Sequence, residues 1–263
     1  MLLFKRILPF QKSEGGLPDK RGDKRYAVGA KYALKARITL VARDGDGHPL
    51  PPEKSVPMDW GGQLVNLSET GANIRVHPAA IAARDEACTL KLELDHMLFE
   101  TAGTVASYRT GSQYVTCGIS LNFPDAYTRK AYQQLMAPIV IATTLEESTD
   151  RVKQDVPGLI KQEYHGQGES MLSTWGEGSG RSLKFFEFLL HDYCVRGSTE
   201  LPGLKIGYRH GVKIRNRIST PAVPVPLSPE HQAEVAKLFR YVVQNLTKSL
   251  PSETRKFLEI FAA

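Results

Sequence analysis

The chain has 263 residues, of which 41% are hydrophobic and 24% are charged, and its formal net charge is +6. This composition is typical of a globular protein and excludes a disordered or collagen-like chain, while the length favours two domains. No run approaches the roughly 18 apolar residues of a spanning helix, and the apolar run at the start is too short for a secretory signal. We therefore expect a cytoplasmic protein with no transmembrane segment.

The charge is unevenly distributed. Residues 1–37 carry a net charge of +7, residues 38–150 carry −6 and residues 151–263 carry +5. A basic arm of this kind suits an anionic partner, such as nucleic acid, a phosphorylated small molecule or a membrane surface, although a solvated tail has the same composition. The apolar start MLLFKRILPF also admits a short membrane-binding or partner-binding helix. Three widely spaced cysteines predict reduced core thiols: Cys88, Cys117 and Cys194.

The first half of the chain shows the alternation of half-buried strands. It is clear over residues 33–41, 72–76, 88–94, 99–108 and 115–123, with a short strand at 63–66. Residues 43–62 are rich in Gly, Pro and Asp, and predict a long inserted loop. Short strands with few helices between them predict a small antiparallel barrel or sandwich. A helix over 125–137 follows, and Pro138 is expected to interrupt it.

The second half predicts a different domain. Residues 143–180 are polar and are expected to form a linker. The spacing of Leu183, Phe186, Leu190 and Tyr193 predicts an amphipathic helix. Ser228 and Pro229 are a helix N-cap and first turn, and a last short helix follows Pro251. With a little strand around 204–214, residues 181–263 are expected to form an α-rich domain.

Two short motifs lie in the barrel half. Arg21 and Arg25 form RxxxR on the basic arm, and Asn66, Ser68 and Gly71 form NxSxxG between two strands. In this order, within an all-β region that ends in a helix, they resemble the PilZ domain, a family of bacterial cyclic di-GMP receptors. The resemblance covers residues 20–142. The expected fold class is therefore α+β: a basic arm (1–19), a PilZ-like antiparallel β-barrel with a following helix (20–142), a linker (143–180) and an α-rich output or docking domain (181–263).

The chemistry of the two motifs agrees with this resemblance. A guanidinium group can fork onto guanine O6 and N7, stack on a purine or clamp a phosphate. The Asn66 amide can pair with a guanine edge, the Ser68 hydroxyl can bond a phosphate or a base, and Gly71 permits a tight turn or a close backbone approach. The predicted ligand-binding residues are Arg21, Arg25, Asn66, Ser68 and Gly71, and we expect the arm to become ordered when the ligand binds. Because the neighbour of Arg21 is Lys20, the sequence leaves open whether one or two dinucleotides bind.

The sequence thus favours a cyclic di-GMP receptor that passes the binding signal to a protein partner or to its C-terminal domain, with no cofactor, metal or catalytic residue. Two alternatives stay open. A nucleic-acid-binding regulator would use the basic residues 205–217. An enzyme in the C-terminal domain would need a pocket joining the glycine run at 176–180 to His191 and Asp192.

Overall fold

The computed structural model describes residue 4 and residues 23–44, 48–50, 56–178, 182–208, 213–214, 217–218 and 225–262. Contacts divide the chain into two compact units, and the division falls within one helix, between Met136 and Ala137. Phe4 and the segment Gly29–Lys31 group with the second unit, whereas Asp23 and the residues up to Val28 group with the first. Among the described residues, no helix has both the length and the hydropathy that are needed to cross a bilayer.

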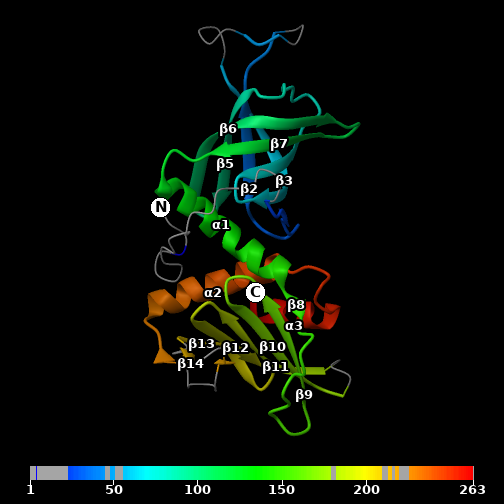
Figure 1. The fold of residues 1–263 in the computed structure, drawn as a ribbon, viewed down its shortest axis with the longest axis vertical. Helices are drawn as coiled ribbons and strands as arrows, with labels where there is room; N and C mark the ends of the chain where they lie inside the picture. The colour runs from blue at the N-terminus through cyan, green and yellow to red at the C-terminus, as the bar shows by residue number, and fades with distance from the viewer. Residues whose placement is uncertain are drawn as a thin grey trace. The chain divides into compact units, whose positions relative to one another are not determined.

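The first unit is a closed antiparallel barrel (Figure 1). Six strands pair in the order β3-β2-β5-β6-β7-β4, and β4 pairs back with β3 to close the ring. The short strand β1 (Tyr26–Ala27) pairs with Asn66 and Leu67 of β3, on the edge of β3 opposite β4. The six barrel strands are β2 (Lys35–Leu40), β3 (Met58–Ser68), β4 (Gly71–Val76), β5 (Ala87–Leu94), β6 (Met97–Thr110) and β7 (Val115–Asn122).

Alternation along these strands sets the barrel core. On β2, Ala36, Ile38 and Leu40 are buried while Lys35 and Arg37 are exposed. The other strands repeat this pattern, because successive side chains point to opposite faces of a sheet. The predicted barrel is therefore confirmed. The predicted loop 43–62 is only partly correct, since β3 begins at Met58.

Helix α1 (Ala126–Thr144) follows the barrel, as expected, but it continues through Pro138. Proline removes one main-chain hydrogen bond and normally kinks or ends a helix. Here, Leu135, Ile139 and Ala142 are fully buried on both sides of the proline. Burial of these apolar side chains outweighs the lost bond, at about 1.5–3 kcal/mol per large side chain.

The second unit contains a seven-stranded antiparallel sheet in the order β16-β13-β12-β11-β10-β9-β8. Two helices, α2 (Pro229–Gln244) and α3 (Ser252–Ala262), cover one face of this sheet (Figure 1). The strands are β8 (Glu146–Glu147), β9 (Ile160–Gly166), β10 (Ser170–Glu177), β11 (Ser182–Leu190), β12 (Tyr193–Ser198), β13 (Leu201–Tyr208) and β16 (Val225–Pro226). The strands β14 (Lys213–Ile214) and β15 (Arg217–Ile218) pair with each other.

Aromatic rings join this sheet to its helices. The ring of Phe186 on β11 stacks on Phe239 of α2 at 5.5 Å, and meets Phe257 and Phe261 of α3 edge-on at 6.0 and 5.3 Å. Phe186 and Phe239 are fully buried. This cluster is the core of the second unit, because aromatic side chains bury large areas in such pairs.

Two expectations for this half were wrong. The segment predicted as a linker, 143–180, contains β8, β9 and β10. The helix predicted through Leu183 and Tyr193 is the hairpin of β11 and β12. Both faces of β11 carry apolar side chains, so the alternation that would identify a strand is hidden. The α-rich domain is therefore a sheet with two helices, and the α+β class is confirmed.

Candidate functional site

The described end of RxxxR, from Asp23 to Arg25, lies beside NxSxxG on the barrel. β1 follows Arg25 directly and pairs with the motif end of β3, with Tyr26 opposite Leu67 and Ala27 opposite Asn66. The Val28 amide continues this pairing by donating to the Val65 carbonyl at 3.1 Å. In this antiparallel register, the backbone of Arg25 comes beside Ser68, where β3 ends.

A side-chain contact also joins the motifs. The hydroxyl of Thr70, within NxSxxG, donates a hydrogen bond to the carboxylate of Asp23, within RxxxR. Both side chains are exposed. Residues 47 positions apart in the sequence are thereby held together on the surface of the barrel. Arg21 lies outside the described residues.

Arg25 and Asn66 keep their polar groups available. Arg25 is exposed and Asn66 is half-buried, and neither side chain makes a hydrogen bond or ion pair with the residues that the structure describes. A bulge in β3 between Leu64 and Asn66 changes the register against β4, so that Asn66 lies opposite Asn73. Arg25 lies two residues before Ala27, the partner of Asn66, so the arginine and the amide are diagonal neighbours at the end of the β1–β3 pairing.

Ser68 and Gly71 have more structural surroundings. Ser68 is buried, with 6% of its surface exposed. A Cβ atom on Gly71 would lie 2.8 Å from the Ile119 carbonyl oxygen of β7 and 3.4 Å from the Ser68 hydroxyl. Gly71 therefore permits the close approach of β7, which is one of the two reasons that the sequence suggested for it.

Tyr132 of α1 fixes this turn through its buried side chain. Its hydroxyl lies 2.9 Å from the main-chain carbonyl oxygens of both Ser68 and Gly71, and its side chain is fully buried. Its ring packs against Phe99 at 5.5 Å and Phe123 at 5.2 Å. Burial raises the pKa of the Tyr132 phenol, and the nearby negative charge of Asp23 adds to this effect, so the hydroxyl keeps its proton for donation.

Sequence reasoning found the two motifs but not the residues that join them. Asp23 and Thr70 occupy positions inside the motifs at which the spacing specifies no residue type. Tyr132 lies within the predicted helix 125–137, and it reads from the sequence as an ordinary core aromatic. Only the fold brings its hydroxyl to the turn.

The described part of the glycine run does not meet His191 and Asp192. Residues 176–178 lie next to the start of β11, where Glu177 pairs with Ser182, whereas His191 and Asp192 form the turn after Leu190. The two places lie at opposite ends of β11, whose nine residues are eight steps of about 3.3 Å, or about 26 Å, from first to last. His191, expected on a helix, has a left-handed φ of 54° in this turn. The pocket that the enzymatic alternative required is therefore not formed by these residues.

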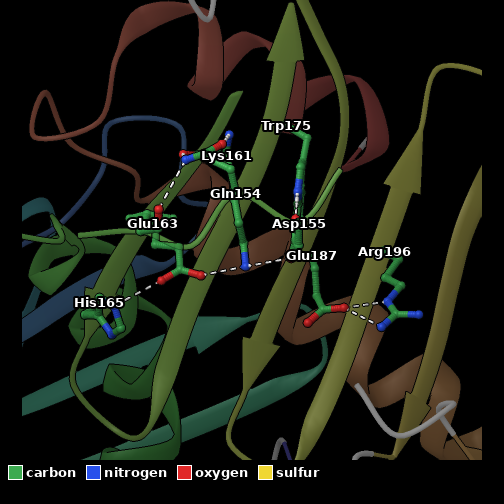
Figure 2. A network of polar contacts seen from close by, with 9 residues as sticks. Gln154, Asp155, Lys161, Glu163, His165, Trp175, Glu187 and Arg196 are labelled. Atoms are coloured by element: carbon green, nitrogen blue, oxygen red, sulfur yellow. Dashed lines mark hydrogen bonds and ion pairs between the residues drawn. The ribbon is translucent and has the colours of Figure 1, made fainter. Parts of the chain in front are cut away.

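The face of the second sheet that the helices leave uncovered carries a polar network, which Figure 2 shows. Asp155 accepts a hydrogen bond from the Trp175 indole at 2.7 Å and pairs with Lys161 at 3.2 Å, and Lys161 also pairs with Glu163 at 2.7 Å. The side-chain amide of Gln154 bonds the main-chain N–H and carbonyl of Lys161 at 2.7 and 3.2 Å.

A second pair, Glu187 with Arg196, lies on β11 and β12 of the same sheet, at 2.5 Å (Figure 2). The carboxylates of this network are thus matched by cations, as in structural ion pairs. Among the described residues, no group of His, Cys, Asp and Glu side chains could hold a metal ion. The three cysteines are buried and form no disulfide, as expected.

Comparison with solved structures finds a similarity to the PilZ domain with c-di-GMP of YcgR from Escherichia coli. The match covers 46% of this chain and 91% of that chain, with 9% sequence identity and a TM-score of 0.34. No family model matches the chain, and no curated protein does. The barrel itself is established by its own strand pairing, which closes six strands ahead of a helix.

Proposed function

We propose that the chain is a cyclic di-GMP receptor and that Arg21, Arg25, Asn66, Ser68 and Gly71 form its binding site. The observation that supports this most is the pairing of β1 with the motif end of β3, which brings the backbone at Arg25, the last residue of RxxxR, next to NxSxxG. A ligand that touches one motif can then reach the other. Without this pairing, the two motifs would be unrelated short patterns.

Each side chain has a role that fits a guanine dinucleotide. The guanidinium of Arg25 forks onto guanine O6 and N7 or stacks on the base, and Arg21 supplies a second guanidinium for base or phosphate. The Asn66 amide pairs with a guanine edge, while the Ser68 hydroxyl and the backbone near Gly71 accommodate phosphate or base. The net charge of +7 over residues 1–37 attracts the anionic ligand.

The route from this site to an output follows the chain. The segment Gly29–Lys31, directly after β1, groups with the second unit. There, the Gly29 amide donates to the Asn245 side chain at 2.8 Å, and Lys31 pairs with Glu259 at 2.8 Å. A change in the position of Arg25 therefore reaches α2 and α3 through five residues of backbone. This short connection supports an output from the C-terminal domain or from a protein partner bound to it.

Titration calorimetry with cyclic di-GMP on the full chain tests the proposal. Arg25→Ala and Asn66→Ala should each weaken binding by about 5- to 150-fold, the equivalent of about 1–3 kcal/mol for a lost bidentate base contact. Arg109→Ala removes an exposed arginine of β6 outside both motifs and is the matched control, which should bind as the unaltered chain does.

Cyclic di-AMP is the matched ligand control. It keeps the phosphates but lacks the guanine O6 and the N1 and N2 donors, so it should bind much more weakly if base edges are read. A full chain that takes up no cyclic di-GMP at saturating concentration, or an Arg25→Ala variant that binds with unaltered affinity, would refute the proposed site.

A further inference from the structure

Asp23 and Thr70 occupy positions at which the two motifs specify no residue type. Their side chains nevertheless form a hydrogen bond that joins one motif to the other. Neither residue is among the five predicted ligand contacts. Asp23 is also acidic, and a carboxylate beside an anionic ligand opposes binding by charge alone. We therefore expect Asp23 to have a role other than contact with the ligand.

Thr70 is a fixed point on the barrel. Its carbonyl accepts a hydrogen bond from the Leu121 amide at 2.8 Å, and the carbonyls of Ser68 and Gly71 on either side are held by Tyr132. The segment that begins at Asp23 is attached to the barrel a second time at Val28, whose amide donates to the Val65 carbonyl. Arg25 lies between these two attachment points.

We propose that Asp23 is a positioning residue: by accepting the Thr70 hydrogen bond, it holds the segment Asp23–Arg25 at the NxSxxG turn and so pre-orders Arg25 for the ligand. This inference rests on the proposed function. Ordering a flexible segment costs free energy for each residue fixed, and a segment held beforehand does not incur that cost when the ligand binds.

The proposal separates the hydrogen bond from the charge. Asp23→Asn keeps a carbonyl oxygen that can accept from Thr70 and removes only the charge, so affinity for cyclic di-GMP should stay the same or increase. Thr70→Val keeps the side-chain shape and removes the donor, so affinity should fall by about 3- to 10-fold, the size of one solvent-exposed hydrogen bond. Thr70→Ser, which restores a hydroxyl, should recover most of that loss.

A double-mutant cycle tests the pairing itself. Asp23→Ala should weaken binding in the unaltered chain but cause no further loss in the Thr70→Val variant. Glu69→Gln removes an exposed charge from the same turn without touching this contact, and it controls for electrostatics. Losses from Asp23→Ala and Thr70→Val that simply add, or a Thr70→Val variant with unaltered affinity, would overturn the positioning role.

Amide hydrogen exchange of the ligand-free chain gives a readout that needs no ligand. The peptide spanning residues 23–28 should exchange faster in Thr70→Val and Asp23→Ala, but not in Asp23→Asn. Unaltered exchange in the first two variants would refute the positioning role even if the chain binds cyclic di-GMP. Conversely, faster exchange in a chain that binds no dinucleotide would retain the positioning contact and reject the proposed function.

Discussion

Tyr132→Phe tests whether the turn at 68–71 depends on one buried hydroxyl. The substitution removes only the oxygen that lies 2.9 Å from the carbonyls of Ser68 and Gly71, and keeps the ring between Phe99 and Phe123. A hydroxyl has a single proton, so the two contacts share one donor and their energies do not add. Leaving a buried carbonyl without its donor costs about 1–3 kcal/mol, and we expect the barrel to lose that much stability.

Hydrogen exchange of the β4 and β7 amides, measured at increasing urea concentration, reports the opening free energy of the barrel. Tyr127→Phe is the matched control, because Tyr127 lies on the same helix with 52% of its surface exposed, and its loss should stay within about 0.5 kcal/mol. A Tyr132→Phe variant as stable as this control would mean that the hydroxyl does not fix the turn. Because the turn forms part of the proposed site, cyclic di-GMP affinity should fall in parallel with stability.

Three further predictions concern other parts of the molecule. Gly71→Ala should cost about 1–3 kcal/mol by chemical denaturation because its Cβ would meet the β7 backbone, whereas Gly61→Ala, with open space around it, should not. Burial raises the pKa of the Cys194 thiol from 9.0 to about 12, so the neutral thiol stabilises the fold below pH 9 and this contribution is lost as the pH rises from 9 toward 12. The urea midpoint should therefore decline less steeply with pH in Cys194→Ala than in the unaltered chain, and equal slopes would contradict this. Phe186→Ala should destabilise the second unit by about 3–5 kcal/mol, seen as faster exchange in β10–β12, and an unaffected sheet would show that the stack on Phe239 is not its core.

The barrel could be predicted from the sequence because its strands have one buried and one exposed face. On β5, buried Cys88 and Leu90 alternate with partly exposed neighbours, and each strand of this kind carries its own period-2 pattern. The motifs could also be placed, since their spacing is local. The Asp23–Thr70 contact could not, because it depends on the register of β1 against β3, which no local pattern specifies.

The second unit was harder to predict for a physical reason. Strand β11 presents Phe186 and Phe188 to the helices and Phe185 and Leu189 to the opposite face, and an apolar run of this kind also fits a helix. Helices α2 and α3 have one exposed side and were predicted correctly. Two-sided burial thus hides a strand, whereas one-sided burial reveals its period.

The side chain of Gln154 protects an exposed edge of the second sheet from pairing with another copy of the chain. Strand β8 covers only two residues of β9, which leaves the main-chain groups of Lys161 facing outward. The side-chain amide of Gln154 occupies both the N–H and the carbonyl of that residue, as a neighbouring strand would. Unpaired main-chain groups at the edge of a sheet are templates for aggregation and domain swapping. Because Gln154 already bonds these groups, a strand of another molecule cannot pair with β9 at Lys161.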